Sequence, residues 1–137
     1  MDPLRLIAWG YAAALLLAAA LNYIPGLTDA QGRAFGIFAL DIYDDLLHLA
    51  SAAWAAVSAY WSRPATKAFL KIFGTLYCLD GLLGLATGSG YLDLGIVIYG
   101  VQSLPLGFKI LANLPHIALG GFAAFCGFVL AGRTGPR

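Results

Sequence analysis

Long apolar runs, separated by short polar segments, dominate the chain. A helix needs roughly 20 mostly apolar residues to cross a hydrocarbon core about 30 Å thick, because each residue rises about 1.5 Å. Four runs have or approach that length, and they predict spanning helices at about residues 4–24, 40–61, 68–87 and 110–131. The pattern therefore predicts an all-α membrane protein in which residues 1–137 form one domain of four transmembrane helices.

The segments that follow the first and third predicted helices are long for so small a protein. Residues 25–40 and 88–109 are expected to form two long extracytoplasmic loops, and loops of this length are typical of ordered caps or binding elements. Within the second loop, residues 94–108 are uncharged but too short and too rich in Gly and Pro to cross the membrane. We expect an interfacial or re-entrant loop there, with a short helix after Ser103.

The positions of Lys and Arg predict the orientation of the chain, because cytoplasmic loops carry an excess of both. Six of the eight fall on one side of the predicted spans and two fall on the other. The six are Arg5, Arg63, Lys67, Lys71, Arg133 and Arg137, and the two are Arg33 and Lys109. We therefore expect a multi-pass protein of the bacterial inner (plasma) membrane, with both the N- and the C-terminus in the cytoplasm.

Composition narrows the class of protein further. Hydrophobic residues make up 61% of the chain and charged residues 11%, whereas a soluble domain carries about a quarter charged residues. A formal net charge of +1 without a Lys/Arg cluster argues against nucleic acid, so the expected partner is the lipid bilayer. The sequence holds neither a GxSxG motif nor a phosphate-binding glycine loop. It therefore predicts no catalytic residue and gives no support for hydrolase or ATPase activity.

An internal repeat aligns the only two histidines of the chain, His48 and His116, at an offset of 116 − 48 = 68 residues. Five apolar pairs are identical at the same offset: Ile42 and Ile110, Leu46 and Leu114, Ala50 and Ala118, Ala55 and Ala123, Ala56 and Ala124. Asp45 aligns with Asn113. The repeat predicts two helix hairpins related by a pseudo-two-fold axis along the membrane normal, with both histidines at a similar depth in the outer half of the bilayer.

Polar side chains of three predicted helices are expected to converge at this depth. Asp80 reaches it from the third helix, and Asp45 lies one turn before His48 on the second. An ionisable residue inside a membrane marks a functional site by default. Imidazole and carboxylate donors suit a transition-metal ion such as zinc, iron or manganese. The predicted metal ligands are Asp45, His48, Asp80 and His116, and Asp41, Asp44 and Asn113 are expected to support them from around the site.

Two other interpretations stay open. In one, His48 and His116 bind a b-type haem from both sides, with room for the porphyrin beside Gly81 and Gly84. In the other, the cluster is only a hydrogen-bonded network between the hairpins, and the protein is an accessory subunit or a small transporter protomer. Transport would require a homo-oligomer or a larger membrane complex, because a single four-helix bundle has little interior volume.

Small residues recur at four-residue spacing on three of the predicted helices. Examples are Ala55 and Ala59 on the second helix and Gly120 and Ala124 on the fourth. Such faces allow two helix backbones to approach closely, which favours helix association in lipid. We therefore expect them to pack helices against one another.

Three short motifs give the chain a resemblance to a known family. The third predicted helix carries Lys71-x-x-Gly74-x-x-Tyr77-x-x-x-Gly81-x-x-Gly84. The second and fourth each start with a polar residue followed by histidine, as Asp45-x-x-His48 and Asn113-x-x-His116. In these motifs the chain resembles a family of small bacterial four-helix integral membrane proteins of unknown function. The resemblance implies the four-helix architecture and makes both histidines matched family positions, but it implies no activity.

Overall fold

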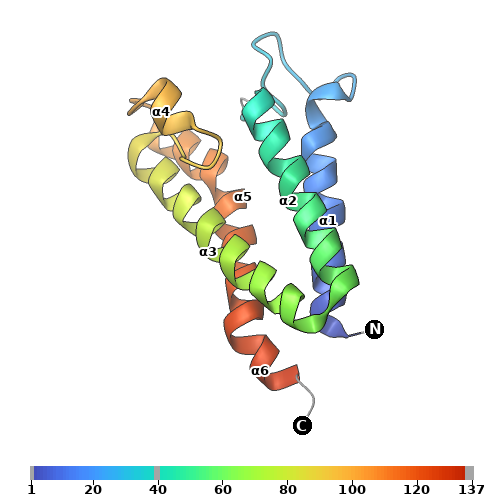
Figure 1. The fold of residues 1–137 in the computed structure, drawn as a ribbon. Coiled ribbons are helices and arrows are strands. Elements are labelled where there is room, and N and C mark those ends of the chain that lie inside the picture. The colour runs from blue at the N-terminus through green and yellow to red at the C-terminus, as the bar shows by residue number, and fades with distance from the viewer. Residues whose placement is uncertain (1, 39–40, 135–137) are drawn as a thin grey trace.

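The computed structural model describes residues 2–38 and 41–134, and its regular elements are all helices (Figure 1). The long helices are α1 (Pro3–Ala20), α2 (Ile42–Trp61), α3 (Arg63–Thr87) and α5 (Leu106–Phe125). The short elements are the 3-10 helix η1 (Leu21–Tyr23), α4 (Gly95–Tyr99), the π-helical segment η2 (Cys126–Leu130) and α6 (Ala131–Thr134). Helix α1 packs mainly on α2, and α3 mainly on α5. We call the end with α4 and η1 the outer end and the end with α6 the inner end (Figure 1).

Within the described residues, three helical stretches are long and apolar enough to cross a membrane: Pro3–Ala20, Arg63–Thr87 and Leu106–Thr134. The chain therefore has the character of a membrane protein, as its sequence predicts. Helix α2 has a similar length but is less apolar, because its first two turns carry two aspartates and a histidine. The fourth membrane span stays a prediction.

The first helix is shorter than the apolar run that predicts it. α1 ends at Ala20, and the chain continues as η1 to Tyr23 rather than as an α-helix to residue 24. Ile24 has extended backbone angles, φ −91° and ψ 119°, which the residue before a proline prefers, and Pro25 follows it. The length of the uncharged run indicates which residues can lie in the membrane. The backbone conformation before Pro25 decides where the helix ends.

Helix α2 begins with a capping box. The Asp41 carboxylate accepts a hydrogen bond from the Asp44 amide at 3.0 Å, and the Asp44 carboxylate accepts one from the Asp41 amide at 3.2 Å. The predicted span starts at residue 40, which lies outside the described residues, and the helix itself starts at Ile42. The two acids therefore have a role in starting the helix, which the spacing Asp41-x-x-Asp44 indicates.

Helix α3 begins earlier than predicted. The Ser62 hydroxyl accepts a hydrogen bond from the Ala65 amide at 3.2 Å, and proline lies in the first turn, so the helix starts at Arg63 instead of residue 68. The cations in its first turns mark the border of the apolar stretch but do not interrupt the helix. Only one residue, Ser62, separates α2 from α3.

The segment before the last long helix also differs from the expectation. Residues 94–108 contain the short helix α4 and the first residues of α5, which begins at Leu106 and not at residue 110. Pro105 immediately precedes α5, where its fixed backbone angle suits a helix start. The helix that we expect after Ser103 is therefore the beginning of α5 itself, and the connecting loop is correspondingly shorter.

Glycines bring α3 and α5 into backbone contact. A Cβ atom on Gly74 would overlap the backbone of Gly120 and Ala124, and a Cβ atom on Gly120 would overlap the backbone of Cys78. Side chains cannot fit between two helices that lie this close. The contacts confirm that the small-residue face of α5 packs against α3.

Aromatic rings fill the centre of the bundle on the inner side of the polar cluster. The ring centroids of Phe69 and Phe73 are 4.9 Å apart, and those of Phe73 and Tyr77 are 4.0 Å apart. The Tyr11 ring lies 5.4 Å from Phe73, and its hydroxyl donates a hydrogen bond to the Leu119 carbonyl at 2.5 Å. These stacked rings pack α1, α3 and α5 together through contacts that are mostly apolar.

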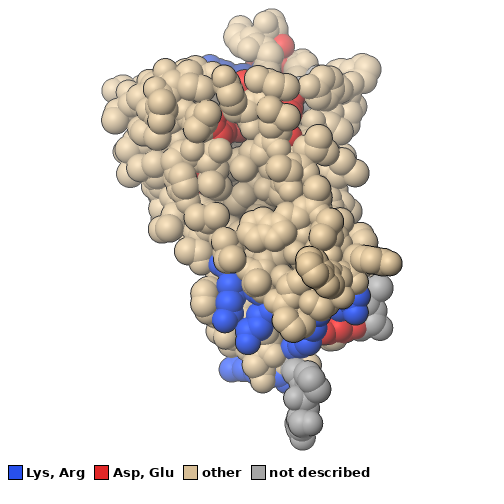
Figure 2. Space-filling model, in the orientation of Figure 1, with Lys and Arg blue, Asp and Glu red and all other residues tan. Residues whose placement is uncertain are grey.

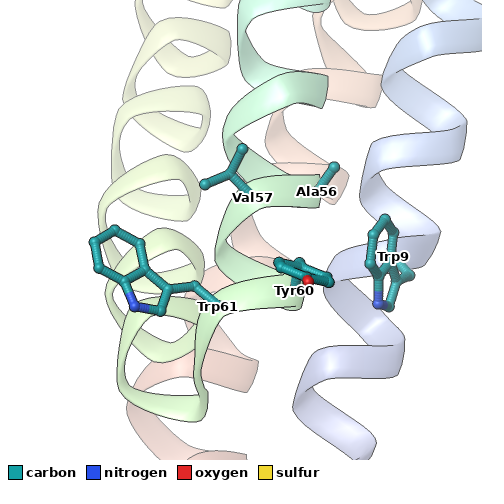
Figure 3. A pocket seen from close by; sticks show the side chains of 5 residues that line it. All are labelled: Trp9, Ala56, Val57, Tyr60 and Trp61. Carbon is teal, nitrogen blue, oxygen red and sulfur yellow. The ribbon is translucent and has the colours of Figure 1, made fainter.

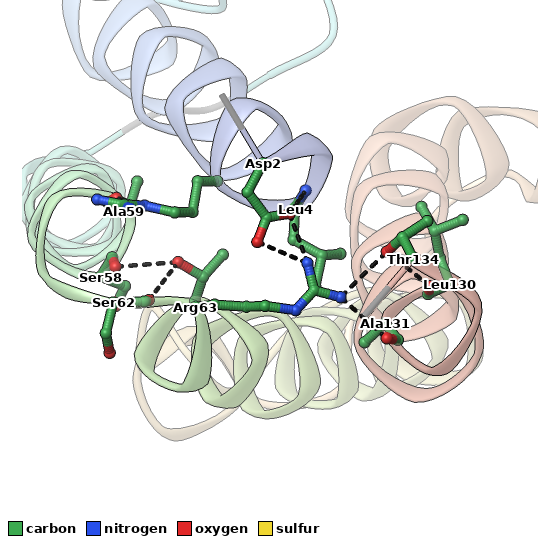
Figure 4. Close-up of polar contacts among 11 residues, drawn as sticks. Asp2, Leu4, Ser58, Ala59, Ser62, Arg63, Leu130, Ala131 and Thr134 are labelled. Atoms are coloured by element: carbon green, nitrogen blue, oxygen red, sulfur yellow. Dashed lines mark hydrogen bonds and ion pairs between the residues drawn. The ribbon is translucent and has the colours of Figure 1, made fainter. Parts of the chain in front are cut away.

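Arginines tie the helices together at the inner end (Figure 4). The Arg63 guanidinium donates to both carboxylate oxygens of Asp2, at 2.5 and 2.6 Å. It also donates to the Ala131 carbonyl at 2.9 Å and to the Thr134 hydroxyl at 3.1 Å. Arg5 donates to two carbonyl groups in the last turn of α2, at 2.6 and 2.7 Å. These contacts connect α1, α2, α3 and α6.

The charged side chains on the visible face are divided between the two ends (Figure 2). Most Lys and Arg side chains gather at the inner end, and acidic side chains are seen in the hollow at the outer end. An acidic patch also lies among the cations at the inner end, so the predicted orientation depends on the Lys and Arg side chains alone.

Candidate functional site

Asp80 has partners on both of its carboxylate oxygens. It lies on α3 and is only 3% exposed. Its Oδ1 accepts hydrogen bonds from the backbone amides of Tyr91 at 2.8 Å and Leu92 at 2.9 Å, and its Oδ2 lies 2.5 Å from Nδ1 of His116. Because both oxygens are engaged, Asp80 is placed to orient His116 rather than to bind a metal ion directly.

His116, on α5, lies against two other side chains of the cluster. Its ring centroid is 6.0 Å from that of His48 on α2, with the ring planes nearly perpendicular, and 5.0 Å from that of Tyr77 on α3. The contact with Asp80 engages Nδ1, so Nε2 is the nitrogen that can accept a proton or bind a ligand. The two histidines of the repeat thus lie next to each other.

Two buried atoms on α2 have no hydrogen-bond partner among the described residues. They are Oδ1 of Asp45 and Nδ1 of His48, and their residues are 9% and 6% exposed. The other oxygen of Asp45 accepts a hydrogen bond from the Tyr23 hydroxyl at 3.0 Å. A buried polar atom without a partner costs about 1–3 kcal/mol, so the partners of these two atoms are expected to come from outside the protein chain.

A cavity of about 300 Å³ lies at the outer end, beside the Asp80–His116 pair. The outer parts of α2, α3 and α5, the segment around α4 and the loop before α2 all contribute to its walls. Asp44, Asp80, Asp93 and His116 are among the lining residues. The volume is at the lower end of the range for small-molecule sites, about 300–1,000 Å³. The cavity therefore gives a small polar ligand access to His116.

The residues expected to support the ligands have other contacts. Asp41 caps α2 and accepts a hydrogen bond from the Tyr99 hydroxyl at 3.1 Å, and Asp44 completes the capping box. Asn113 lines the cavity, but its amide packs against Gly84 and donates to the carbonyl of Lys109 in its own helix at 2.8 Å. None of these three is hydrogen-bonded to a histidine within the part of the chain that the structure describes.

No family model, no curated protein and no solved structure matches the chain. The resemblance to small four-helix membrane proteins therefore stays a prediction.

The four predicted metal ligands do not form a complete ligand set. Within residues 2–38 and 41–134, no group of three or more His, Cys, Asp or Glu side chains is placed to hold a metal ion. The structure does bring His48 and His116 together. With metal–nitrogen distances of about 2.0–2.1 Å, the ring centroids of two imidazoles on one ion lie about 6.4 Å apart in a linear arrangement and about 5 Å apart in a tetrahedral one. The observed 6.0 Å lies between these values, so a tetrahedral site requires the two rings to approach each other by about 1 Å.

The residues do not fit a haem between the histidines. The room expected beside two glycines of α3 is occupied by α5, because a Cβ atom on Gly81 would meet Ile117 and one on Gly84 would overlap Asn113. A porphyrin needs space on all sides of the iron, and the tight packing of α3 against α5 leaves no such space on the side of these two glycines.

A second hollow, of about 810 Å³, lies on α1 and the last turns of α2 (Figure 3). Its walls are Trp9, Ala56, Val57, Tyr60 and Trp61. It contains no His, Asp or Cys side chain, and Tyr60 and Trp61 are 78% and 77% exposed. Aromatic side chains at a helix end are typical of residues that anchor a helix at the membrane interface.

Sequence reasoning missed several residues of the site. Ser89 and Asp93 line the cavity, and the buried hydroxyl groups of Ser51 and Tyr77 lie 2.9 Å apart directly beside the histidines. Asp93 and Ser89 lie in a loop without periodicity, so their position depends on how the loop folds over α3. Of these residues, only Tyr77 could have been predicted from spacing, because it lies three residues before Asp80 and therefore on the same face of the helix.

Proposed function

We propose that this is a four-span protein of the bacterial inner membrane that binds a transition-metal ion between His48 and His116. One observation carries the proposal: an imidazole oriented by a carboxylate, His116, lies beside a buried imidazole, His48, whose Nδ1 has no partner among the described residues. A carboxylate that fixes one ring nitrogen and leaves the other for the ion is a common arrangement around metal-binding histidines.

Two protein nitrogens leave coordination positions open. Asp45, one turn before His48, adds a carboxylate oxygen that no described residue hydrogen-bonds, and an acidic side chain favours a cation. The cavity beside His116 allows water or a small molecule to fill the remaining positions, as in zinc sites that keep one exchangeable ligand. Zinc, iron and manganese accept this mixture of nitrogen and oxygen donors.

The proposed membrane topology is two hairpins with both termini in the cytoplasm. The pairing of α1 with α2 and of α3 with α5 supports the hairpins. The cations at the inner end support the orientation, because Lys and Arg favour the cytoplasmic side. In this arrangement α2 crosses the membrane with its acidic turns at the outer surface, beside the cavity.

Elemental analysis tests the metal site directly. The protein is purified in mild detergent without chelators and without a His-tag, from cells grown with zinc, iron and manganese. We expect near-stoichiometric metal in the wild type and at least about a tenfold loss in His116→Ala and in His48→Ala. Asp80→Asn is expected to weaken metal affinity by about 10–100-fold, because it removes only the group that orients His116.

The control is Cys78→Ala, which removes a potential metal ligand from α3 outside the cluster and is expected to keep its metal. Size-exclusion profiles of all variants show whether they fold. Metal-free wild-type protein that also takes up no zinc, iron or manganese in equilibrium dialysis would contradict the proposal.

A further inference from the structure

The cavity at the outer end carries both signs of charge. Besides the Asp80–His116 pair, its walls hold two acids, Asp44 and Asp93, and two cations, Arg33 and Lys109. The four come from α2, the loop before α4, the loop before α2 and the first turn of α5. Chain segments that are far apart in sequence therefore bring paired charges around one space.

The two acids lie on the wall of the same cavity. Asp44 is 6% exposed and comes from α2, and Asp93 comes from the loop before α4. One oxygen of each is engaged locally, because Asp44 Oδ2 accepts the Asp41 amide and Asp93 Oδ1 accepts the Gly95 amide at 2.9 Å. Two acidic side chains on one cavity wall favour a positively charged ligand group there.

Ser89 supplies an independent indication of a ligand. It lines the cavity and is 6% exposed, and its hydroxyl has no hydrogen-bond partner among the described residues. Thr87 fixes its backbone, accepting a hydrogen bond from the Ser89 amide at 3.3 Å and donating one to the Ser89 carbonyl at 2.8 Å. The hydroxyl is thus buried beside the cavity without a hydrogen-bond partner among the described residues, and buried polar atoms are normally hydrogen-bonded.

The two cations are available to an anionic group. Within the described residues, neither Arg33 nor Lys109 forms an ion pair with an acid. The Arg33 guanidinium lies 5.4 Å above the ring of Phe108, a contact that uses its flat face and leaves its N–H donors at the edge. An arginine and a lysine at one cavity wall suit a carboxylate or a phosphate.

We infer that this cavity binds a small zwitterion, with its ammonium group at Asp44 and Asp93 and its anionic group at Arg33 and Lys109. The Ser89 hydroxyl hydrogen-bonds the same molecule. A volume of about 300 Å³ accepts a molecule of amino-acid size. A free solute and the headgroup of a zwitterionic lipid share this chemistry. The inference rests on the cavity and its charges and does not require the proposed metal.

Calorimetric titration of the full-length protein in detergent, with EDTA present, tests the inference. The probes are L-alanine, which carries both charges, ethylamine, which carries only the ammonium group, and propionate, which carries only the carboxylate. A short-chain phosphatidylethanolamine forms a separate arm that tests a lipid headgroup as the source. We expect at least one of the two zwitterions to bind at least tenfold more tightly than ethylamine and propionate.

Variants connect the binding to the residues. Asp93→Asn and Lys109→Gln are each expected to weaken zwitterion binding at least tenfold, and Ser89→Ala about threefold. Lys67→Gln, which removes a cation from the inner end, is the matched control and is expected to bind like the wild type. Zwitterions that bind no better than the singly charged probes would overturn the inference, as would binding that survives both Asp93→Asn and Lys109→Gln. Because EDTA is present, a missing metal site does not affect the result.

Discussion

The two ends of the helix bundle differ in how many of their buried polar groups are hydrogen-bonded. At the inner end, Arg63 donates to four acceptor atoms within 3.1 Å, and the Thr66 hydroxyl reaches two backbone carbonyls at 2.9 Å. At the outer end lie the three buried side-chain atoms that have no partner within the described ranges: Asp45 Oδ1, His48 Nδ1 and Ser89 Oγ. Polar groups at the inner end therefore hold the fold together, whereas these three at the outer end contribute no hydrogen bond to it within the described ranges.

The close contact of α3 and α5, which lies between these two ends, is expected to give the largest mutational effect. Gly120→Val places side-chain atoms into the backbone of α3, so we expect it to lower the free energy of unfolding by at least about 3 kcal/mol or to prevent folding. Gly121→Val is the matched control, because a Cβ atom at Gly121 meets no other atom within 4 Å. Denaturant unfolding in detergent measures both. Equal stability of the two variants would show that α3 and α5 do not pack through glycine.

Removal of an inner-end contact is expected to be the next largest effect. Arg63→Met takes away the donor of four hydrogen bonds and leaves Asp2 without its partner, so stability should fall by about 2 kcal/mol. Lys67→Met, at an exposed position on the same helix, should change it by less than about 0.5 kcal/mol. Metal content should not change in either variant. A loss of metal in Arg63→Met would mean that the two ends are coupled.

The ion pair at the inner end predicts a smaller, pH-dependent effect. Burial raises the pKa of Asp2, but the hydrogen bonds from Arg63 and from the Leu4 amide outweigh it and lower the pKa below 3.8. The stabilisation is therefore complete above pH 3.8 and is lost as the pH falls through the lower folded-state value. Because solvent screens this pair, we expect less than about 1 kcal/mol.

Asp2→Asn tests the sign of this dependence, since asparagine still caps α1 but carries no charge. The wild type should melt at a higher temperature than the variant near pH 7, and the difference should disappear below pH 3.8. A difference that grows on acidification would contradict the assignment.

The smallest stability effect is expected at the outer end. Ser89→Ala removes a hydroxyl that has no partner among the described residues, so the free energy of unfolding should change by less than about 0.5 kcal/mol or rise slightly. Ser62→Ala removes a hydroxyl that caps α3 and should cost about 1 kcal/mol. Thermal melts of the two variants compare an unpaired hydroxyl with a paired one. A large loss in Ser89→Ala would show that a partner inside the protein exists.

The sequence predicts the helices better than their ends. Apolar runs locate three membrane-length helices, because the cost of exposing charge to lipid is a property of composition. Helix starts depend instead on single capping contacts, such as Ser62 with the Ala65 amide, and these shift α3 by five residues, from 68 to Arg63. The spacing of Asp41 and Asp44 contained the corresponding signal for α2.

In the candidate site, the sequence spacing of residues predicts which side chains lie on the same face of one helix. The internal repeat predicts which residues of two different helices lie at a similar depth. The structure brings His48 and His116, the two residues that the repeat aligns, next to each other, while the repeat itself stays a prediction. The repeat did not predict the hydrogen bonds of Asp80. One of its oxygens accepts from the amides of Tyr91 and Leu92, and these belong to a loop whose sequence has no periodic pattern. Loop geometry also decided the position of Ser89.

The single residue between α2 and α3 has a mechanical consequence. Ser62 forms a tight corner at the inner end, and the helices on either side of it are 20 and 25 residues long. At about 1.5 Å per residue, each helix acts as a lever arm of roughly 30 Å or more. A rotation of about 5° at this corner moves the far tip of α2 by between 2 and 3 Å, on the order of one atomic diameter. Because Arg5 and Thr66 hydrogen-bond to the carbonyls of this corner, they also fix how far apart the outer ends of α2 and α3 lie.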